Sequence, residues 1–244
     1  MTHSPNLSRA TPPEARPTTP GASSRVGGFS KLRVLVACEY SGRVRDAFLA
    51  RGHDAMSCDL LPTDSPGPHY QGDALDLLGQ PWDLIVAHPP CTYISRAGAR
   101  WMYPKAGSIC EERLRLALSA KSLFMKILAA DCQRICVENP TPLKVVGLPR
   151  HSQAIQPYQF GHPYSKRTLL WLKGLPKLRP TNVTSDFQPF LRSNTGKGAR
   201  MGQASSKGVA KDWKEASTTF EGIADAMAAQ WGGVACSARL ETAE

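Results

Sequence analysis

The chain has 244 residues, enough for one full hydrophobic core, and its 30 Lys and Arg residues against 20 Asp and Glu residues give a net charge of +10. This excess favours a polyanionic partner, most simply nucleic acid. The seven cysteines show no CxxC pair and no zinc-ligand spacing, no signal peptide is recognisable, and no apolar stretch is long enough to span a bilayer. We therefore expect a cytoplasmic protein with reduced thiols, no bound metal and no membrane attachment; the sequence leaves the oligomeric state open, and a monomer is favoured.

The first 29 residues are rich in Pro, Ser, Thr and Gly and contain almost no large apolar side chains. Such a segment cannot bury enough surface to offset its ordering entropy, so we expect a disordered tail over 1–29. Residues 30–232 are expected to form one catalytic domain, and residues 233–244 a flexible C-terminal tail.

Apolar runs that alternate with helical segments characterise the domain. The first run, 34–38, is followed by a turn and a helical segment that ends near Gly52. Further strands are expected at 55–58, 82–87, 134–137 and 169–172, a long helix before the fourth of these five strands, and a last helix at about 222–231. This alternation predicts an α/β fold with a doubly wound, mostly parallel sheet, in which ligands bind beyond the carboxyl ends of the strands.

Polar residues stand at those strand ends. Gly42 follows the first strand, where a glycine lets the backbone approach a cofactor, and Asp59 ends the second strand, where an acid can bind ribose hydroxyls. Gly72 and Asp73 form a turn whose acid can contact an adenine amino group or simply cap the turn.

A cysteine follows the third expected strand, directly after two prolines. Pro89 and Pro90 stiffen the chain before Cys91, and Glu138 ends the next strand on the same edge of the sheet. A thiolate and a carboxylic acid together suit addition of sulfur to C6 of a pyrimidine ring while the acid protonates N3, which makes C5 nucleophilic. Arg167 is a candidate cation for lowering the pKa of the thiol.

These residues resemble the ordered motifs of the DNA cytosine-5 methyltransferases. The resemblance is carried by Pro90-Cys91, Glu138-Asn139, the 38–42 turn and the 220–227 segment, and covers about residues 32–232. It is closest to a small, phage-associated branch of the family, in which the segments found here at 88–93 and 159–163 recur. Thr92 stands where the family usually has Gln, and Pro140 where it has Val.

The resemblance implies a Rossmann-like fold of the S-adenosylmethionine-dependent methyltransferase type, and methyl transfer from that cofactor to C5 of cytosine in DNA through a covalent Cys91 adduct. Catalysis would rest on Cys91, Glu138 and Arg167. The residues that it implies for cofactor binding are Tyr40, Ser41, Gly42, Asp59, Asp73, Pro89, Gly222, Ile223 and Ala224.

A segment from about 180 to 218 is rich in Ser, Thr, Gly and basic residues, and we interpret it as a mobile loop that binds DNA phosphates. The expected contacts are Lys166, Arg192, Lys197, Arg200 and Lys207, with Lys211 and Lys214 nearby. The segment is too short for the target-recognition domain of larger relatives, so sequence recognition should be short or relaxed.

Two other functions remain open at this point. His88-Pro89-Pro90 also resembles the motif of exocyclic amino methyltransferases, whose mechanism needs no cysteine. A catalytically inactive nucleic-acid-binding protein could retain the same fold, and such a protein would not bind the cofactor.

Overall fold

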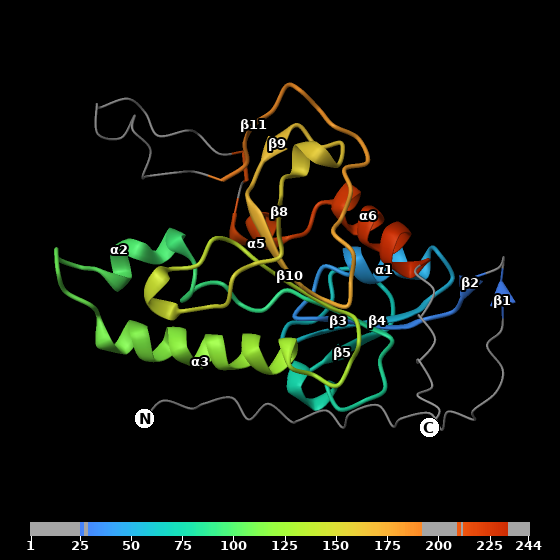
Figure 1. Ribbon diagram of the computed structural model, residues 1–244, viewed down its shortest axis with the longest axis horizontal. Coiled ribbons are helices and arrows are strands. Elements are labelled where there is room, and N and C mark those ends of the chain that lie inside the picture. The colour runs from blue at the N-terminus through green and yellow to red at the C-terminus, as the bar shows by residue number, and fades with distance from the viewer. Residues whose placement is uncertain (1–24, 27–28, 192–208, 211, 234–244) are drawn as a thin grey trace, which may run out of the picture.

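The computed structural model describes residues 25–26, 29–191, 209–210 and 212–233, and its centre is a seven-stranded sheet (Figure 1). The strands in spatial order are β5 (His69–Gln71), β4 (Asp54–Asp59), β3 (Arg33–Ala37), β6 (Leu84–Ala87), β7 (Ile135–Asn139), β10 (Thr168–Lys173) and β8 (Gln153–Ile155). The first five are parallel to one another, whereas β10 is antiparallel to both of its neighbours. The strand order reverses at β3, as it does in doubly wound sheets.

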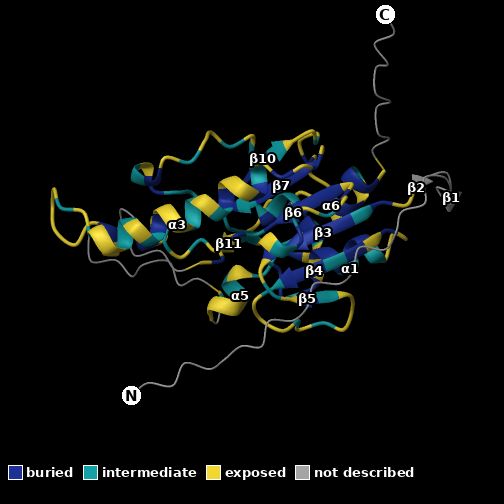
Figure 2. Ribbon diagram, turned by 90° about the horizontal axis from the view of Figure 1, so that it is seen from below, coloured by how far each residue is buried: buried dark blue, intermediate teal, exposed yellow. Residues whose placement is uncertain are grey.

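Strands in the middle of the sheet are apolar on both faces because helices cover both faces. Val34 and Val36 of β3 pack toward α1 (Arg43–Leu49) and α6 (Glu221–Gly232), which contact each other. The alternate residues Leu35 and Ala37 pack on the other face, in a cluster that contains Phe124 of α3 (Glu111–Leu128). Figure 2 shows the resulting buried centre, with exposed residues on the outer sides of the helices.

Short elements surround this core. They are β1 (Arg25–Val26), β2 (Phe29–Ser30), η1 (Ala74–Asp76), η2 (Arg96–Gly98), α2 (Ala99–Met102), η3 (Lys144–Val146), η4 (Pro157–Gln159), β9 (Tyr164–Ser165), β11 (Gln188–Pro189) and α5 (Trp213–Ser217). In Figure 1, η4, β9 and β11 form a small lobe at the top of the molecule, where β9 and β11 pair in parallel. The lobe is held by backbone hydrogen bonds such as Gly161 N to Asn182 O (2.7 Å) and Thr184 N to Tyr158 O (2.8 Å).

The sheet confirms the predicted α/β fold with its doubly wound, mostly parallel, Rossmann-like arrangement. All five strands expected from the sequence are present with shifts of one or two residues at their ends. The segment interpreted as a loop from 180 to 218 contains β11 and α5 in its described parts, and the tail interpreted as disordered ends in β1 and β2, which pair with each other. No helix among the described residues has the length and apolar character required to cross a membrane.

Candidate functional site

Cys91 and Glu138 are held at the ends of adjacent parallel strands. The register pairs Ala87 of β6 with Val137 of β7, so one further step along both strands places His88 beside Glu138. Cys91 lies four residues beyond Ala87, the last residue of β6, and it is half-buried. The sequence predicted that the thiol and the carboxyl group share this edge of the sheet, and the register supplies the physical reason.

The two loops that follow these strands are hydrogen-bonded to each other. Leu143 N donates to Ile94 O (2.8 Å), and Arg96 N donates to Thr141 O (2.9 Å). The side chain of Asn139 donates from Nδ2 to the carbonyl oxygen of Pro89 (2.7 Å). The loop after β6 and the loop after β7 therefore hold the thiol and the carboxyl group in a fixed relation.

Glu138 has a histidine partner that the sequence analysis did not assign. His88 Nδ1 lies 3.2 Å from Glu138 Oε2, and the two side chains are only 10% and 19% exposed. The motif containing His88 was visible in the sequence, but its partnership depends on the register between β6 and β7. Cys91, Glu138, His88 and Lys166 form the candidate catalytic site, and we call them the catalytic cluster.

Lys166, and not Arg167, is the cation of this cluster. The charge of Lys166 acts on both Glu138 and Cys91, whereas Arg167 is exposed. The Lys166 amino group lies 5.9 Å from the ring centroid of Phe190 and 5.7 Å from that of Phe220. Burial lowers the pKa of Lys166, and the negative charges of Glu138 and Cys91 oppose this shift.

The Cys91 thiol is protonated when the cluster is at rest. Burial raises its pKa, Glu138 raises it further, and Lys166 opposes both effects. Ionisation of Cys91 is therefore favoured only when the negative charge on Glu138 is neutralised or when a substrate consumes the proton.

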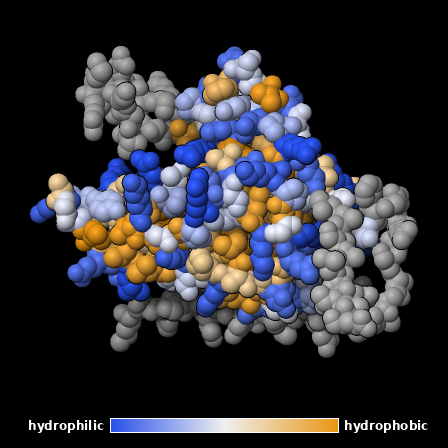
Figure 3. All heavy atoms as spheres, viewed as in Figure 1, coloured by the Kyte–Doolittle hydropathy of each residue, from blue (hydrophilic) through white to orange (hydrophobic). Residues whose placement is uncertain are grey.

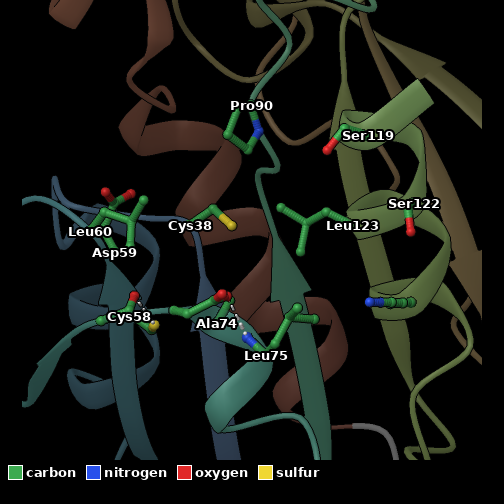
Figure 4. Close-up of a pocket in the computed structure, with 13 residues that line it drawn as sticks. Cys38, Cys58, Asp59, Leu60, Ala74, Leu75, Pro90, Ser119, Ser122 and Leu123 are labelled. Carbon is green, nitrogen blue, oxygen red and sulfur yellow. Dashed lines mark hydrogen bonds between the residues drawn. The ribbon is translucent and has the colours of Figure 1, made fainter. Parts of the chain in front are cut away.

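A cavity of about 310 Å³ lies beyond the carboxyl ends of β3, β4 and β5 (Figure 4). We call it the strand-end cavity. Its size lies within the range of small-molecule sites. Leu60, Leu75 and Leu123 provide apolar walls, and Asp59 and Asp73 provide carboxylates. Polar groups from α3 complete it, namely Ser119, Ser122 and Lys126. Pro90 also lines the cavity, so the cavity extends to the residue next to Cys91.

Both acids expected from the sequence line this cavity and are fixed by local turns. Asp59 Oδ1 accepts the backbone N–H of Leu61 (2.9 Å), and Asp73 Oδ1 accepts that of Leu75 (2.9 Å). Burial raises the pKa of Asp59, while the Leu61 N–H and the nearby histidines His69 and His88 oppose the shift.

The glycine turn after β3 lies outside the lining of the cavity. Gly42 has a φ of 73° and precedes α1, whose first amide groups donate to the buried Glu39 carboxylate, with Val44 N at 2.7 Å. The Tyr40 hydroxyl donates to Lys214 O (3.0 Å) at α5. Ser41 Oγ donates to Glu39 Oε1 (3.3 Å).

Two cysteines line the cavity at positions that the sequence analysis did not assign. Cys38 has a φ of 57°, and burial raises its pKa well above the ordinary value; burial also raises the pKa of Cys58, to about 12. Both thiols therefore act as small apolar groups in the wall.

The start of α6 also lies outside the cavity lining. Gly222 N donates to His162 Nε2 (2.9 Å), and Ile223 and Ala224 are buried in the core between α6 and the sheet. Pro89 lies in the chain between His88 of the catalytic cluster and Pro90 of the cavity lining, and its carbonyl oxygen accepts a hydrogen bond from the Asn139 side chain. The cofactor roles of these residues remain predictions.

Most residues of the expected DNA-binding loop are outside the part of the chain that the structure describes. They are Arg192, Lys197, Arg200, Lys207 and Lys211. Lys214 is described, and its amino group lies 3.5 Å from Asp64 Oδ1 and 5.5 Å from the ring centroid of Tyr40.

A second basic segment directly follows Cys91. Residues 92–110, which we call the 92–110 arm, contain no acidic residue. Arg96, Arg100, Trp101 and Lys105 are exposed, and the Arg100 guanidinium lies 4.3 Å from the ring centroid of Trp101. Met102 is fully buried and anchors the arm. Figure 3 shows apolar surface over the neighbouring α3, where Leu118 is exposed.

No family model matches the sequence, and no curated protein matches it. Among solved structures, the bifunctional kinase-methyltransferase WbdD is 10% identical, with a TM-score of 0.34 over 70% of this chain and 41% of that one. A co-crystal structure of WbdD with a kinase inhibitor gives 10% identity, a TM-score of 0.33, and coverage of 60% and 37%. The Entamoeba histolytica methyltransferase EhMeth is 10% identical, with a TM-score of 0.34 over 64% of this chain and 58% of that one.

This chain thus spans well under two thirds of the length of those proteins. At these TM-scores the similarity carries no argument, and the assignment of the fold rests on the strand order and register described above.

Proposed function

We propose that this chain is an S-adenosylmethionine-dependent DNA (cytosine-5)-methyltransferase. The observation that carries the proposal is the catalytic cluster: a thiol, a carboxyl group and a cation meet at the ends of β6 and β7, one residue from the lining of the strand-end cavity. This combination suits a nucleophilic addition that needs an acid at the same time.

The cluster can perform this addition without a change in its total charge. Cys91 attacks C6 of cytosine as a thiolate, and Glu138 delivers a proton to N3, so the proton lost by sulfur balances the proton gained by the ring. The C5 carbon then becomes the nucleophile. After methyl transfer, C5 loses its proton to solvent, the bond between sulfur and C6 breaks, and N3 returns its proton to Glu138. Lys166 offsets the negative charge that Cys91 and Glu138 share throughout.

The strand-end cavity fits the nucleoside part of the cofactor. We assign Asp59 to the two ribose hydroxyls and Asp73 to the adenine amino group, while Leu60, Leu75 and Leu123, which also line the cavity, would provide apolar surface for the base. When bound, S-adenosylmethionine supplies a methyl group on a sulfonium centre that a nucleophilic carbon can attack. Pro90 lies at the boundary between this cavity and Cys91.

A DNA partner is supported by the charge of the chain and by the 92–110 arm. Arg96, Arg100 and Lys105 can neutralise phosphates, and the half-exposed Trp101 ring can stack on a base or replace one that has rotated out of the duplex. Because the arm begins at the residue after Cys91, DNA bound to it would lie close to the nucleophile.

The test combines methyl transfer with adduct formation. We expect the wild-type protein to transfer labelled methyl groups from the cofactor to mixed-sequence plasmid DNA, with 5-methylcytosine found by nucleoside mass analysis. Cys91→Ala should abolish transfer and retain cofactor binding, whereas the control Cys110→Ala, at the start of α3, should remain active. DNA that contains 5-fluorocytosine should form a stable adduct with the wild type, because fluorine cannot leave C5 as a cation.

Other outcomes would identify the other functions. Methylated exocyclic amino groups, with turnover retained in Cys91→Ala, would identify an amino methyltransferase. DNA binding without cofactor binding would identify a catalytically inactive DNA-binding protein.

A further inference from the structure

His88 contacts the carboxyl group that donates the proton in the proposed reaction. Its Nδ1 atom lies 3.2 Å from Glu138 Oε2. The imidazole is nine-tenths buried. Its other nitrogen, Nε2, is buried and has no hydrogen-bond partner among the residues that the structure describes.

The unpartnered nitrogen indicates which ring nitrogen carries the proton. A buried N–H group without an acceptor is costly and rare, so a neutral ring favours the tautomer with hydrogen on Nδ1. In that tautomer Nδ1–H donates to Glu138 Oε2, and Nε2 is an acceptor without a donor.

We propose, on the basis of the function proposed above, that His88 is a positioning residue for Glu138. Its Nδ1–H holds Oε2, which leaves Oε1 to carry the proton that is delivered to N3 of cytosine. When that proton has left, Glu138 is a carboxylate and the hydrogen bond from Nδ1–H becomes charge-assisted. The bond is thus stronger in the adduct than in the state in which Glu138 has been protonated for delivery, and a bond that strengthens as the proton leaves favours transfer of that proton to N3.

The groups around Glu138 support this role. Leu170 of β10 is its neighbour on the other side of β7 and has no hydrogen-bonding side chain. Lys166 supplies charge, and among the described residues the Glu138 carboxyl group has one side-chain hydrogen bond, that with His88. Loss of His88 would therefore leave the developing carboxylate without an N–H donor at Oε2.

The experiment isolates the addition step. Addition of Cys91 to C6 makes C5 able to take up deuterium from heavy water without the cofactor, and nucleoside mass analysis measures this exchange in plasmid DNA. His88→Leu should lower both exchange and methyl transfer by about 10- to 100-fold, with little change in the KM for DNA. His88→Asn should recover most of both rates, because its Nδ2–H occupies the place of Nδ1–H. The control His151→Leu, at a ring that packs against Trp171, should be unaffected.

A double substitution tests whether His88 acts through Glu138. In a Glu138→Gln background, His88→Leu should cause no further loss of exchange. Full activity of His88→Leu, equal losses in His88→Asn and His88→Leu with cofactor binding retained, or additive losses in the double variant would each overturn the proposal. If the proposed function itself were wrong, the wild-type protein would show neither deuterium exchange at C5 nor methyl transfer to C5 of cytosine, which is a different result.

Discussion

At the scale of single residues, the catalytic cluster depends on opposing charges around one thiol. Glu138 raises the pKa of Cys91 and Lys166 lowers it, so the two neighbours should have opposite effects on the reactivity of the thiol. Since only the thiolate reacts with alkylating reagents, the rate of alkylation reports this balance directly.

We predict that Glu138→Gln speeds the alkylation of Cys91 by iodoacetamide about three- to tenfold near neutral pH, and that Lys166→Met slows it by a similar factor. In the wild type, the rate should continue to rise above pH 9.0, the ordinary pKa of a thiol, because the pKa of Cys91 is raised. Mass mapping of labelled peptides separates Cys91 from the half-buried Cys110, whose rate serves as the internal control. Changes of the same sign in both variants would contradict this description of the cluster.

The sequence predicted that the thiol and the acid share one edge of the sheet, but it assigned Arg167 as the neighbouring cation where the structure has Lys166, for a geometric reason. Lys166 and Arg167 are adjacent, and successive side chains of an extended chain point to opposite sides. Which of them faces Glu138 depends on the backbone just before β10, where the Gln156 side chain accepts the Lys166 N–H (2.9 Å). This contact lies ten residues away and has no sequence pattern.

At the scale of elements, the segment 159–163 packs against the start of α6 at Gly222. Gly222 lies so close to Phe160 that a Cβ atom would overlap the Phe160 carbonyl oxygen, and the same Cβ would lie 3.1 Å from His162 Nε2. This contact fixes the start of α6 against the segment that leads to β9.

We predict that Gly222→Ala destabilises the protein by about 1–3 kcal/mol, because the start of α6 must move away and lose the hydrogen bond to His162. Urea unfolding measures the change. Gly79→Ala is the matched control, since nothing lies within 4 Å of its Cβ position and it should be close to neutral. Equal stability of Gly222→Ala and the wild type would show that α6 adapts without cost.

The long strands and helices could be predicted from the sequence, whereas the short elements could not. β3 and β6 are buried on both faces and give continuous apolar runs. β5 and β8 have three residues each, too few to establish a period. The polar residues that α3 contributes to the strand-end cavity were also missed, because they depend on how the helix packs and not on its own pattern.

At the scale of the whole molecule, the net charge of +10 should dominate the affinity for DNA. The arm that follows Cys91 contributes three of the exposed cations, and phosphate contacts carry no base information. Recognition should therefore be short or relaxed.

We predict that binding to duplex DNA weakens steeply with salt, and that replacing Arg96, Arg100 and Lys105 together by Gln reduces the log–log salt slope by about 2 to 3. The loss of affinity should be about equal for DNA of different sequences. Lys31→Gln, an exposed cation just before the opposite end of β3, is the control and should change the slope little. Anisotropy titrations at several salt concentrations measure both, and a loss restricted to one sequence would contradict a phosphate-contact role.

The hydrogen bonds between the loop after β6 and the loop after β7 position Cys91 relative to Glu138 before a substrate base binds. The bonds from the Leu143 and Arg96 amides and from the Asn139 side chain hold the two loops that carry Cys91 and Glu138 together. The distance between nucleophile and acid is thus set during folding, and the entropy of bringing them together has been lost before any substrate arrives. Separation of the two loops requires the loss of these bonds, so the loops share the stability of this edge of the sheet.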